Sequence, residues 1–274
     1  MKPTGEQLIH KSRDDFGELH IKDDGLIRTL YFGNEKKQTC TFLPDPSVLI
    51  LQYAQAMTSL LLFEQAPEKI LLVGLGGGSM LHFLRKACPE SQIDVIELRQ
   101  SVIDISHDYF SVPRDDKQIN IIQADAKHYV EKLSQESNGT YSWILVDAFD
   151  AWGPAQLNKD DKFIQSCQSL LKSKGIMCFN LWNRKEDYFH HISRQLSDLF
   201  SGNTLELRLG KKNSNVIVFG FLQAQPLKRS RQQEVIACQL SEAYGIDYLR
   251  FYKLIEVQNY SLLNRLRKQL TVQF

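Results

Sequence analysis

The feature that most constrains the fold is a series of continuous apolar runs, separated by segments of helical character, between residues 69 and 182. Five runs have this character: 69–75, 92–98, 119–125, 142–149 and 175–182. A strand that is apolar on both sides must be covered on both faces, and parallel neighbours need a crossover connection, usually a helix. The pattern therefore predicts an α/β protein with a parallel sheet between two layers of helices.

Two further apolar stretches, at residues 204–209 and 215–222, are joined by only a short connection. A short connection is typical of antiparallel neighbours, so these stretches predict a hairpin at the end of the sheet. Seven strands with a terminal antiparallel hairpin suit a Rossmann sheet of the class I S-adenosylmethionine (SAM) methyltransferase type. They fit a plain dinucleotide-binding fold less well.

The segment before this sheet has a different character. Three short stretches rich in β-branched and aromatic residues are separated by glycine-containing turns: 17–21, 26–32 and 37–43. Pro44 and Pro46 end them, and we therefore expect residues 1–46 to form a small antiparallel β lobe. An apolar helix is expected to follow from Ser47, as N-cap, to Phe63.

The remaining boundaries follow from changes in composition. Residues 47–225 are expected to form the Rossmann-like domain, and residues 226–274 a C-terminal helical extension of two helices that break near Gly245. This extension is basic, so contact with an acidic partner or an RNA is an alternative to helices docked on the domain, and docking is the interpretation we favour.

Charge and composition exclude several classes of protein. The net charge is +1, which disfavours a nucleic-acid-binding protein. No apolar run is long enough to span a membrane and the N-terminus lacks the apolar core of a signal peptide, so a cytoplasmic protein is expected. The 5 cysteines are scattered without a C-x-x-C pair, so neither a disulfide framework nor a metal site is expected.

A glycine-rich turn, Gly74-Leu75-Gly76-Gly77-Gly78, directly follows the first parallel run and opens a helix. Glycine permits a tight turn and lets a ligand lie against the backbone, while the start of a helix offers unpaired N–H groups. The last position of a G-x-G-x-x-G pattern is Ser79 here, which disfavours NAD as the ligand.

Acidic residues end the next runs. Glu97 is placed to accept hydrogen bonds from ribose hydroxyls, and Asp125 from an adenine amino group, with Ala126 leaving room for the ring. Asp147 ends the fourth predicted strand, and Asp150 follows three residues later. Any one of these acids could instead be a helix N-cap. Together, at the strand ends where open α/β sheets bind ligands, they favour an adenosine-type ligand.

These residues lie in motifs that resemble the spermidine synthases, or polyamine aminopropyltransferases, and the resemblance covers roughly residues 17–222. Residues 52–63 resemble the family's Y-x-E-M-x-x-H helix, and the glycine turn resembles G-G-G-D-G. Residues 95–106 resemble V-E-I-D-x-x-V-I-x-x-S, and residues 123–126 resemble its G-D-G/A motif. The most specific match is ILVDAFDAWGP, at residues 144–154, to I-x-x-D-x-x-D-P-x-G-P.

The resemblance implies a transferase of polyamine biosynthesis that moves an aminopropyl group from decarboxylated SAM to a small amine, as a homodimer and without a metal. Asp147 would take a proton from the attacking amine and Asp150 would help to hold it. Gln38 would reach the nucleotide from the lobe. Tyr53, Gln55 and Trp152 would lie on the substrate side, where Trp152 either covers the substrate or packs the loop against the lobe.

The chain departs from the family on the amine side. Gly77 stands where the family carries Asp, and Gln55 and Ser59 stand where it carries Glu and His. Ala151 replaces a proline, and residues 213–215 replace a tyrosine and glycines. Without a carboxylate at Gly77, the carboxylate of intact SAM would be repelled less. We therefore expect an altered acceptor site, with a SAM-dependent methyltransferase or a non-catalytic nucleotide-binding homologue as the alternatives.

Overall fold

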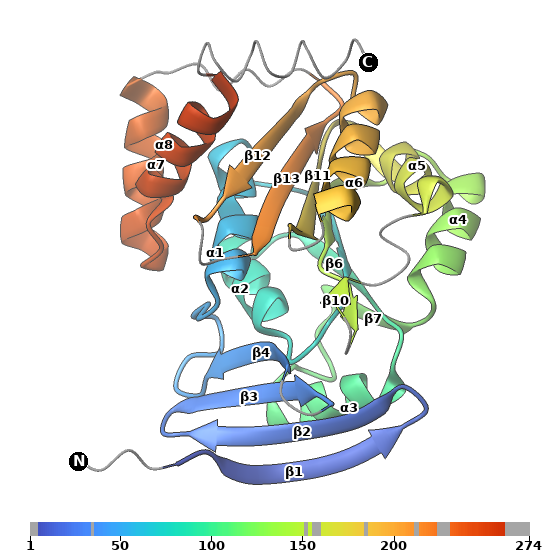
Figure 1. Ribbon diagram of the computed structural model, residues 1–274, viewed down its shortest axis with the longest axis vertical. Coiled ribbons are helices and arrows are strands. Elements are labelled where there is room, and N and C mark those ends of the chain that lie inside the picture. The colour runs from blue at the N-terminus through green and yellow to red at the C-terminus, as the bar shows by residue number, and fades with distance from the viewer. Residues whose placement is uncertain are drawn as a thin grey trace.

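The computed structural model describes residues 5–33, 36–150, 153–154, 160–183, 186–210, 214–223 and 231–260, arranged as a small antiparallel sheet beside a larger mixed sheet with helices on both faces (Figure 1). The strands of the larger sheet are β5 (Lys69–Val73), β6 (Gln92–Glu97), β7 (Ile119–Gln123), β8 (Tyr141–Val146), β11 (Leu171–Trp182), β12 (Thr204–Arg208) and β13 (Asn215–Phe221). Their order is β12-β13-β11-β8-β5-β6-β7.

The strand directions confirm the predicted sheet. Strands β7, β6, β5, β8 and β11 pair in parallel, whereas β13 pairs antiparallel with both β11 and β12. The chain leaves β5 toward β6 and β7 on one side, and returns to β8 and β11 on the other. The order therefore reverses between β5 and β8, and such a reversal opens a crevice outside the carboxyl ends of the strands.

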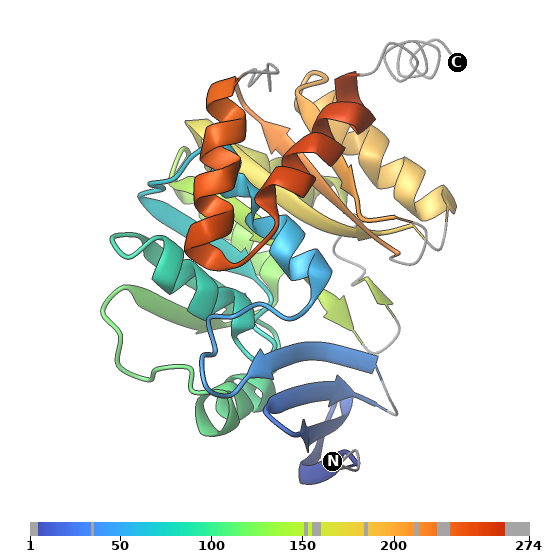
Figure 2. The ribbon, with the colours of Figure 1, turned by 90° about the vertical axis from the view of Figure 1, so that its left-hand side faces the viewer.

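Two layers of helices cover this sheet. The helices are α1 (Gln52–Met57), the 3-10 helix η1 (Thr58–Leu62), α2 (Ser79–Ala87), α3 (Gln100–Tyr109), α4 (Ala126–Glu136), α5 (Asp161–Leu170), α6 (Glu186–Leu199), α7 (Arg231–Tyr244) and α8 (Tyr248–Tyr260). Helices α1, η1, α2, α7 and α8 share one core, and α4, α5 and α6 share the other (Figures 1 and 2).

Strand β5 divides its side chains between these two cores. Ile70 and Leu72 belong to the first core, and Leu71 and Val73 belong to the second. Successive side chains of a strand point to opposite faces, so a strand that is apolar at every position requires cover on both sides. The continuous apolar runs of the sequence are thereby explained.

The N-terminal lobe is a four-stranded antiparallel sheet of β1 (Gln7–Asp14), β2 (Gly17–Asp24), β3 (Ile27–Phe32) and β4 (Lys36–Phe42). Its apolar face packs on α3, where Leu19, Leu30 and Phe32 lie in one buried cluster with Val102 and Phe110. The lobe therefore has no core independent of α3, and it is held against the carboxyl edge of the larger sheet.

Two local features differ from the predictions. Strand β1 lies at the exposed edge of the lobe, and its mostly polar sequence, QLIHKSRD, carries no apolar pattern that would reveal it. Helix α1 begins at Gln52 rather than after Ser47, so the predicted N-cap was wrong. The N–H of Ser47 instead donates to Asp45 Oδ1 at 3.0 Å, and a turn holds the chain there.

The C-terminal helices are docked on the domain, as favoured. Gly245, with a φ of +67°, separates α7 from α8, which confirms the predicted break. Tyr248 and Ile255 are fully buried in the first core, and the Tyr248 hydroxyl lies 2.7 Å from Thr58 Oγ1 of η1. None of the described helices has both the length and the apolar character needed to cross a membrane. The boundaries at residues 46 and 225 stay predictions.

Candidate active site

The glycine turn and Asp147 meet at the point where the strand order reverses. Gly74 follows β5 and Asp147 follows β8, and the N–H of Asp147 donates to the carbonyl oxygen of Val73 at 3.0 Å. Gly74 has a φ of +99°, and a Cβ atom there would lie 2.5 Å from the main-chain oxygen of Asp147. Only glycine fits both the backbone conformation and the space at this position.

The lobe fills the space over the rest of the turn. The N–H of Gly77 donates to Thr39 Oγ1 at 3.0 Å, and a Cβ on Gly76 would lie 2.4 Å from the same oxygen. A Cβ on Gly78 would lie 2.3 Å from Val112 Cγ2. On one side of the turn these glycines let protein side chains lie against the backbone, and the predicted approach of a ligand stays a prediction.

A second threonine of β4 repeats this contact. Thr41 Oγ1 lies 2.9 Å from Ser79 Oγ, and the Ser79 hydroxyl lies 3.2 Å from the carbonyl oxygen of Cys40. Residues two apart on a strand point to the same face, so Thr39 and Thr41 grip the turn and the start of α2 together. The lobe and the glycine turn are thus joined by side-chain hydrogen bonds.

Glu97 lies beside the glycine turn, as predicted. It is the last residue of β6 and 9% exposed, and its two carboxylate oxygens accept the N–H groups of Leu75 at 3.1 Å and Arg99 at 3.0 Å. Burial raises the pKa of this carboxyl, and these main-chain donors oppose the rise. The carboxylate is therefore held in a fixed position next to the turn.

Asp125 has a structural role, and its predicted contact with an adenine stays a prediction. It lies just beyond β7 as the N-cap of α4, and its Oδ1 accepts the N–H of His128 at 3.2 Å. The N-cap alternative considered for the acids is thus realised at this position. The side chain is 50% exposed at the crevice edge of the sheet, and Ala126, the first residue of α4, is buried.

Asp147 is surrounded by hydrogen-bond donors. Asn180 Nδ2 donates to Asp147 Oδ1 at 2.8 Å, and the Tyr53 hydroxyl of α1 also bonds to this carboxylate. Burial raises the pKa of Asp147 to about 6 and these two donors oppose the rise. The Tyr53 oxygen lies 3.3 Å from the main-chain oxygen of Gln38, so three residues predicted separately are brought together.

Sequence reasoning missed Asn180, although it is detectable. It is a fully buried amide within the apolar run GIMCFNLW of β11, and a buried polar side chain requires a hydrogen-bond partner. Its partners are Asp147 and Asn215, whose Nδ2 donates to Asn180 Oδ1 at 2.8 Å. Thr39 was missed as well, because its partner is a main-chain N–H that leaves no trace in the sequence.

Other predicted site residues lie elsewhere or beyond the described part of the chain. Gln55 Nε2 donates to the main-chain oxygen of Leu49 at 2.7 Å, which turns its amide toward the loop before α1. Ser59 is fully buried, and its hydroxyl has no hydrogen-bond partner among the described residues. Trp152, Ala151 and Asn213 lie outside the described residues, as does the side chain of Asp150.

The backbone around Asp150 is nevertheless described. Strand β9 (Phe149–Asp150) pairs antiparallel with β10 (Gly153–Pro154), and this short hairpin lies between the larger sheet and the lobe (Figures 1 and 2). The described residues Phe149–Asp150 and Gly153–Pro154 thus form a separate two-stranded sheet and do not extend β8.

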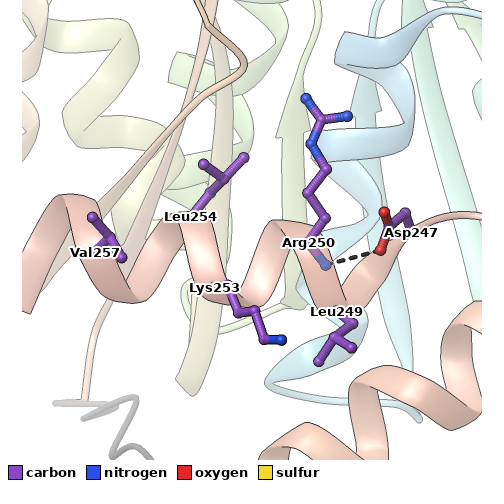
Figure 3. A pocket seen from close by; sticks show the side chains of 6 residues that line it. All are labelled: Asp247, Leu249, Arg250, Lys253, Leu254 and Val257. Atoms are coloured by element: carbon purple, nitrogen blue, oxygen red, sulfur yellow. Dashed lines mark hydrogen bonds between the residues drawn. The ribbon is translucent and has the colours of Figure 1, made fainter.

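A hollow of about 400 Å³ lies elsewhere on the surface, along α8 and the turn before it (Figure 3). Its lining residues are Asp247, Leu249, Arg250, Lys253, Leu254 and Val257. None of these residues belongs to the predicted site. The predicted site and this hollow are therefore formed by different residues.

Comparison with known proteins agrees with this geometry. The profile of the spermine/spermidine synthase domain matches residues 51–209. The polyamine aminopropyltransferase of Neisseria meningitidis serogroup A is 31% identical over 92% of this chain and 94% of its own length. That of Chromobacterium violaceum is 30% identical over 88% of this chain and 90% of its own length.

Solved structures of lower identity share the fold. The spermidine synthase of Thermotoga maritima superposes with a TM-score of 0.69 at 19% identity, covering 97% of this chain and 88% of that one. Human methyltransferase-like protein 13 superposes with a TM-score of 0.59 at 24% identity, covering 73% of this chain and 93% of that one. Because the domain profile spans more than half of the chain and the two curated relatives span most of it, the chain belongs to the spermine/spermidine synthase family of transferases.

Proposed function

We propose that this protein transfers an aminopropyl group from decarboxylated SAM to a small amine. The observation that carries the proposal is the environment of Asp147, at the reversal of strand order and beside the glycine turn. With a pKa of about 6, its carboxyl is ionised at neutral pH and still basic enough to accept a proton. A general base needs both properties.

In the proposed reaction this carboxylate accepts the proton that the attacking amine loses. Amines of the acceptor titrate near a pKa of about 10, so the attacking nitrogen must lose a proton. That nitrogen bonds to the aminopropyl carbon attached to the sulfonium while the carbon–sulfur bond breaks. The electron pair stays on sulfur, methylthioadenosine leaves, and Asp147 takes the proton. Alignment of nitrogen, carbon and sulfur in the crevice supplies a further part of the rate gain.

The nucleotide side of the proposal uses the remaining predicted residues. Glu97 would accept hydrogen bonds from the ribose, and Asp125 and Ala126 would hold the adenine. Gln38 and Tyr53 would close the crevice from the lobe and α1. The fixed main-chain contacts of Glu97 with Leu75 and Arg99 support its part, since they hold the carboxylate before any ligand arrives.

The acceptor site is proposed to be altered relative to the family. Gln55 has its amide bound to Leu49. At Gly77 a Cβ would lie 2.9 Å from Phe110 Cδ1 and 3.0 Å from Thr39 Cγ2, so the place of the family's aspartate is filled by other side chains. Asp150 and Trp152 would hold the amine from the β9–β10 side. An acceptor with fewer positive charges than the family's diamine is therefore expected.

Methyl transfer from intact SAM is the second candidate, favoured by the absence of a carboxylate at Gly77. Titration calorimetry with SAM and decarboxylated SAM, followed by product analysis with a panel of amines, separates the two. Release of methylthioadenosine with an alkylated amine supports aminopropyl transfer. Tighter binding of intact SAM with release of S-adenosylhomocysteine would overturn it. The homodimer, the cytoplasmic location and the absence of a metal stay predictions.

A further inference from the structure

Two asparagines lie in line behind Asp147. Asn180 is on β11 and Asn215 begins the neighbouring antiparallel strand β13. Asn180 is fully buried, with its Nδ2 donating to Asp147 Oδ1 at 2.8 Å and its Oδ1 accepting from Asn215 Nδ2 at 2.8 Å. The three side chains form a continuous hydrogen-bonded row across β8, β11 and β13.

The row fixes which end of the Asn180 amide faces the carboxylate. An asparagine side chain has a donating and an accepting end, and rotation by half a turn exchanges them. An ionised carboxylate only accepts hydrogen bonds, so the Asn180 nitrogen points at Asp147 and the Asn180 oxygen accepts from Asn215 Nδ2. The carboxylate therefore always meets a donor, and a donor stabilises the ionised form of a carboxyl over the protonated form.

The other groups that interact with Asp147 bring no charge that would replace the Asn180 donor. Among the described residues, the titratable ones are Tyr53 from α1 and Cys178 from β11. Burial raises the pKa of both, so neither carries a charge at neutral pH. The Tyr53 hydroxyl donates to the main-chain oxygen of Gln38 at 3.3 Å and also interacts with Asp147, and Cys178 is neutral. Among the described residues, the Asn180 amide is thus a neutral donor at 2.8 Å that favours the ionised form of Asp147.

We propose that Asn180, oriented by Asn215, is a positioning residue that keeps the Asp147 carboxylate ionised and aimed into the crevice. Asn180 acts through Asp147 and has no exposed surface with which to touch a substrate. The proposal rests on the proposed function only in that Asp147 is the base. The state of the carboxyl itself can be measured without turnover.

The test replaces Asn180 by leucine, which is similar in size and lacks the donor. Loss of one hydrogen bond to a charged group shifts a protonation equilibrium by about one pH unit. Asn180→Leu is therefore expected to move the acidic limb of the kcat/KM profile to higher pH by about that amount. Asn215→Ala should move it less in the same direction, because the freed Asn180 amide can then rotate.

A matched control exists on strands β6 and β7, where an asparagine and an aspartate are paired. Asn120 Nδ2 donates to Asp94 Oδ1 at 3.1 Å, so Asn120→Leu removes an asparagine–aspartate bond outside the crevice. This variant should leave the profile unchanged. Carbon NMR titration of the Asp147 carboxyl in the free protein gives a readout that needs no substrate and reports the same shift.

The outcomes separate the two proposals. A raised titration midpoint in Asn180→Leu supports the positioning role, even if the unmodified protein transfers no aminopropyl group, which would overturn the proposed function alone. Unchanged midpoints in Asn180→Leu and Asn215→Ala would overturn the positioning role. If Asn180→Leu does not fold, Asn215→Ala decides, since Asn215 is only partly buried.

Discussion

Thr39 on the lobe stands where a side chain on Gly77 would have to go. Its hydroxyl accepts the Gly77 N–H at 3.0 Å, and its methyl carbon lies 3.0 Å from the position of a Cβ on Gly77. Phe110 closes the other side at 2.9 Å. Gly77 does not have a left-handed φ, so the restriction is one of space and not of backbone conformation.

Restoring the family's aspartate by Gly77→Asp should therefore destabilise the protein. Insertion of a side chain into a well-packed site costs about 1–3 kcal/mol, and a carboxylate against the Phe110 ring adds a desolvation penalty. Urea unfolding measures the loss. Phe110→Ala should be less damaging in the Gly77→Asp background than alone, because the freed space admits the new side chain. Additive effects in this double-mutant cycle would contradict the packing argument.

Removing the charge of Glu97 should weaken nucleotide binding. Glu97→Gln keeps the shape but gives up a charged acceptor, and hydrogen bonds to charged groups contribute about 1.5–3 kcal/mol. We expect the Kd for methylthioadenosine to rise roughly 10- to 100-fold by calorimetry. Glu90→Gln, at an exposed position after α2, is the matched control and should bind as the parent does. If both variants bind methylthioadenosine with equal affinity, Glu97 does not contact the nucleotide.

Much of the fold could be predicted because buried parallel strands leave continuous apolar runs, as at Ile70–Val73. The carboxylates Glu97 and Asp147 could be predicted for the same reason, since each follows directly on such a run. Strand β1 could not, because an exposed edge strand carries no apolar pattern. Neither could Thr39, because which lobe residue meets the glycine turn depends on how the lobe docks.

The protonation of Asp147 determines how activity should change with pH. Burial raises its pKa to about 6, so the carboxylate is ionised above that pH and protonated below it. As the base must be unprotonated, kcat/KM should rise with pH through about 6 and fall about tenfold per pH unit below it. Asp147→Asn should lower kcat by roughly 10²- to 10⁴-fold while methylthioadenosine still binds. A variant that keeps full activity would show that another group takes the proton.

Arg99 should be important for holding the lobe. Its guanidinium is 6% exposed, bonds to both Asp14 oxygens at 3.0 and 2.8 Å, and lies 4.5 Å from the Phe32 ring centre. Breaking a fully buried pair costs about 3–5 kcal/mol, and Asp14 keeps some solvent contact, so Arg99→Ala should cost roughly 2 kcal/mol. Arg114→Ala, at an exposed pair with Asp108, should cost under about 1 kcal/mol. Equal losses in urea unfolding would contradict this view.

The C-terminal helices should be indispensable for folding, although their sequence reads as a separate extension. Tyr248, Tyr252 and Ile255 are fully buried in the core that also contains β5 and α2. A chain ending at residue 225 would expose this apolar surface and should aggregate or bind a hydrophobic dye, whereas a chain ending at Tyr260 keeps every one of these contacts. Expression of both, with circular dichroism and light scattering, tests the difference. A monodisperse, cooperatively unfolding 1–225 chain would show that the domain is complete without them.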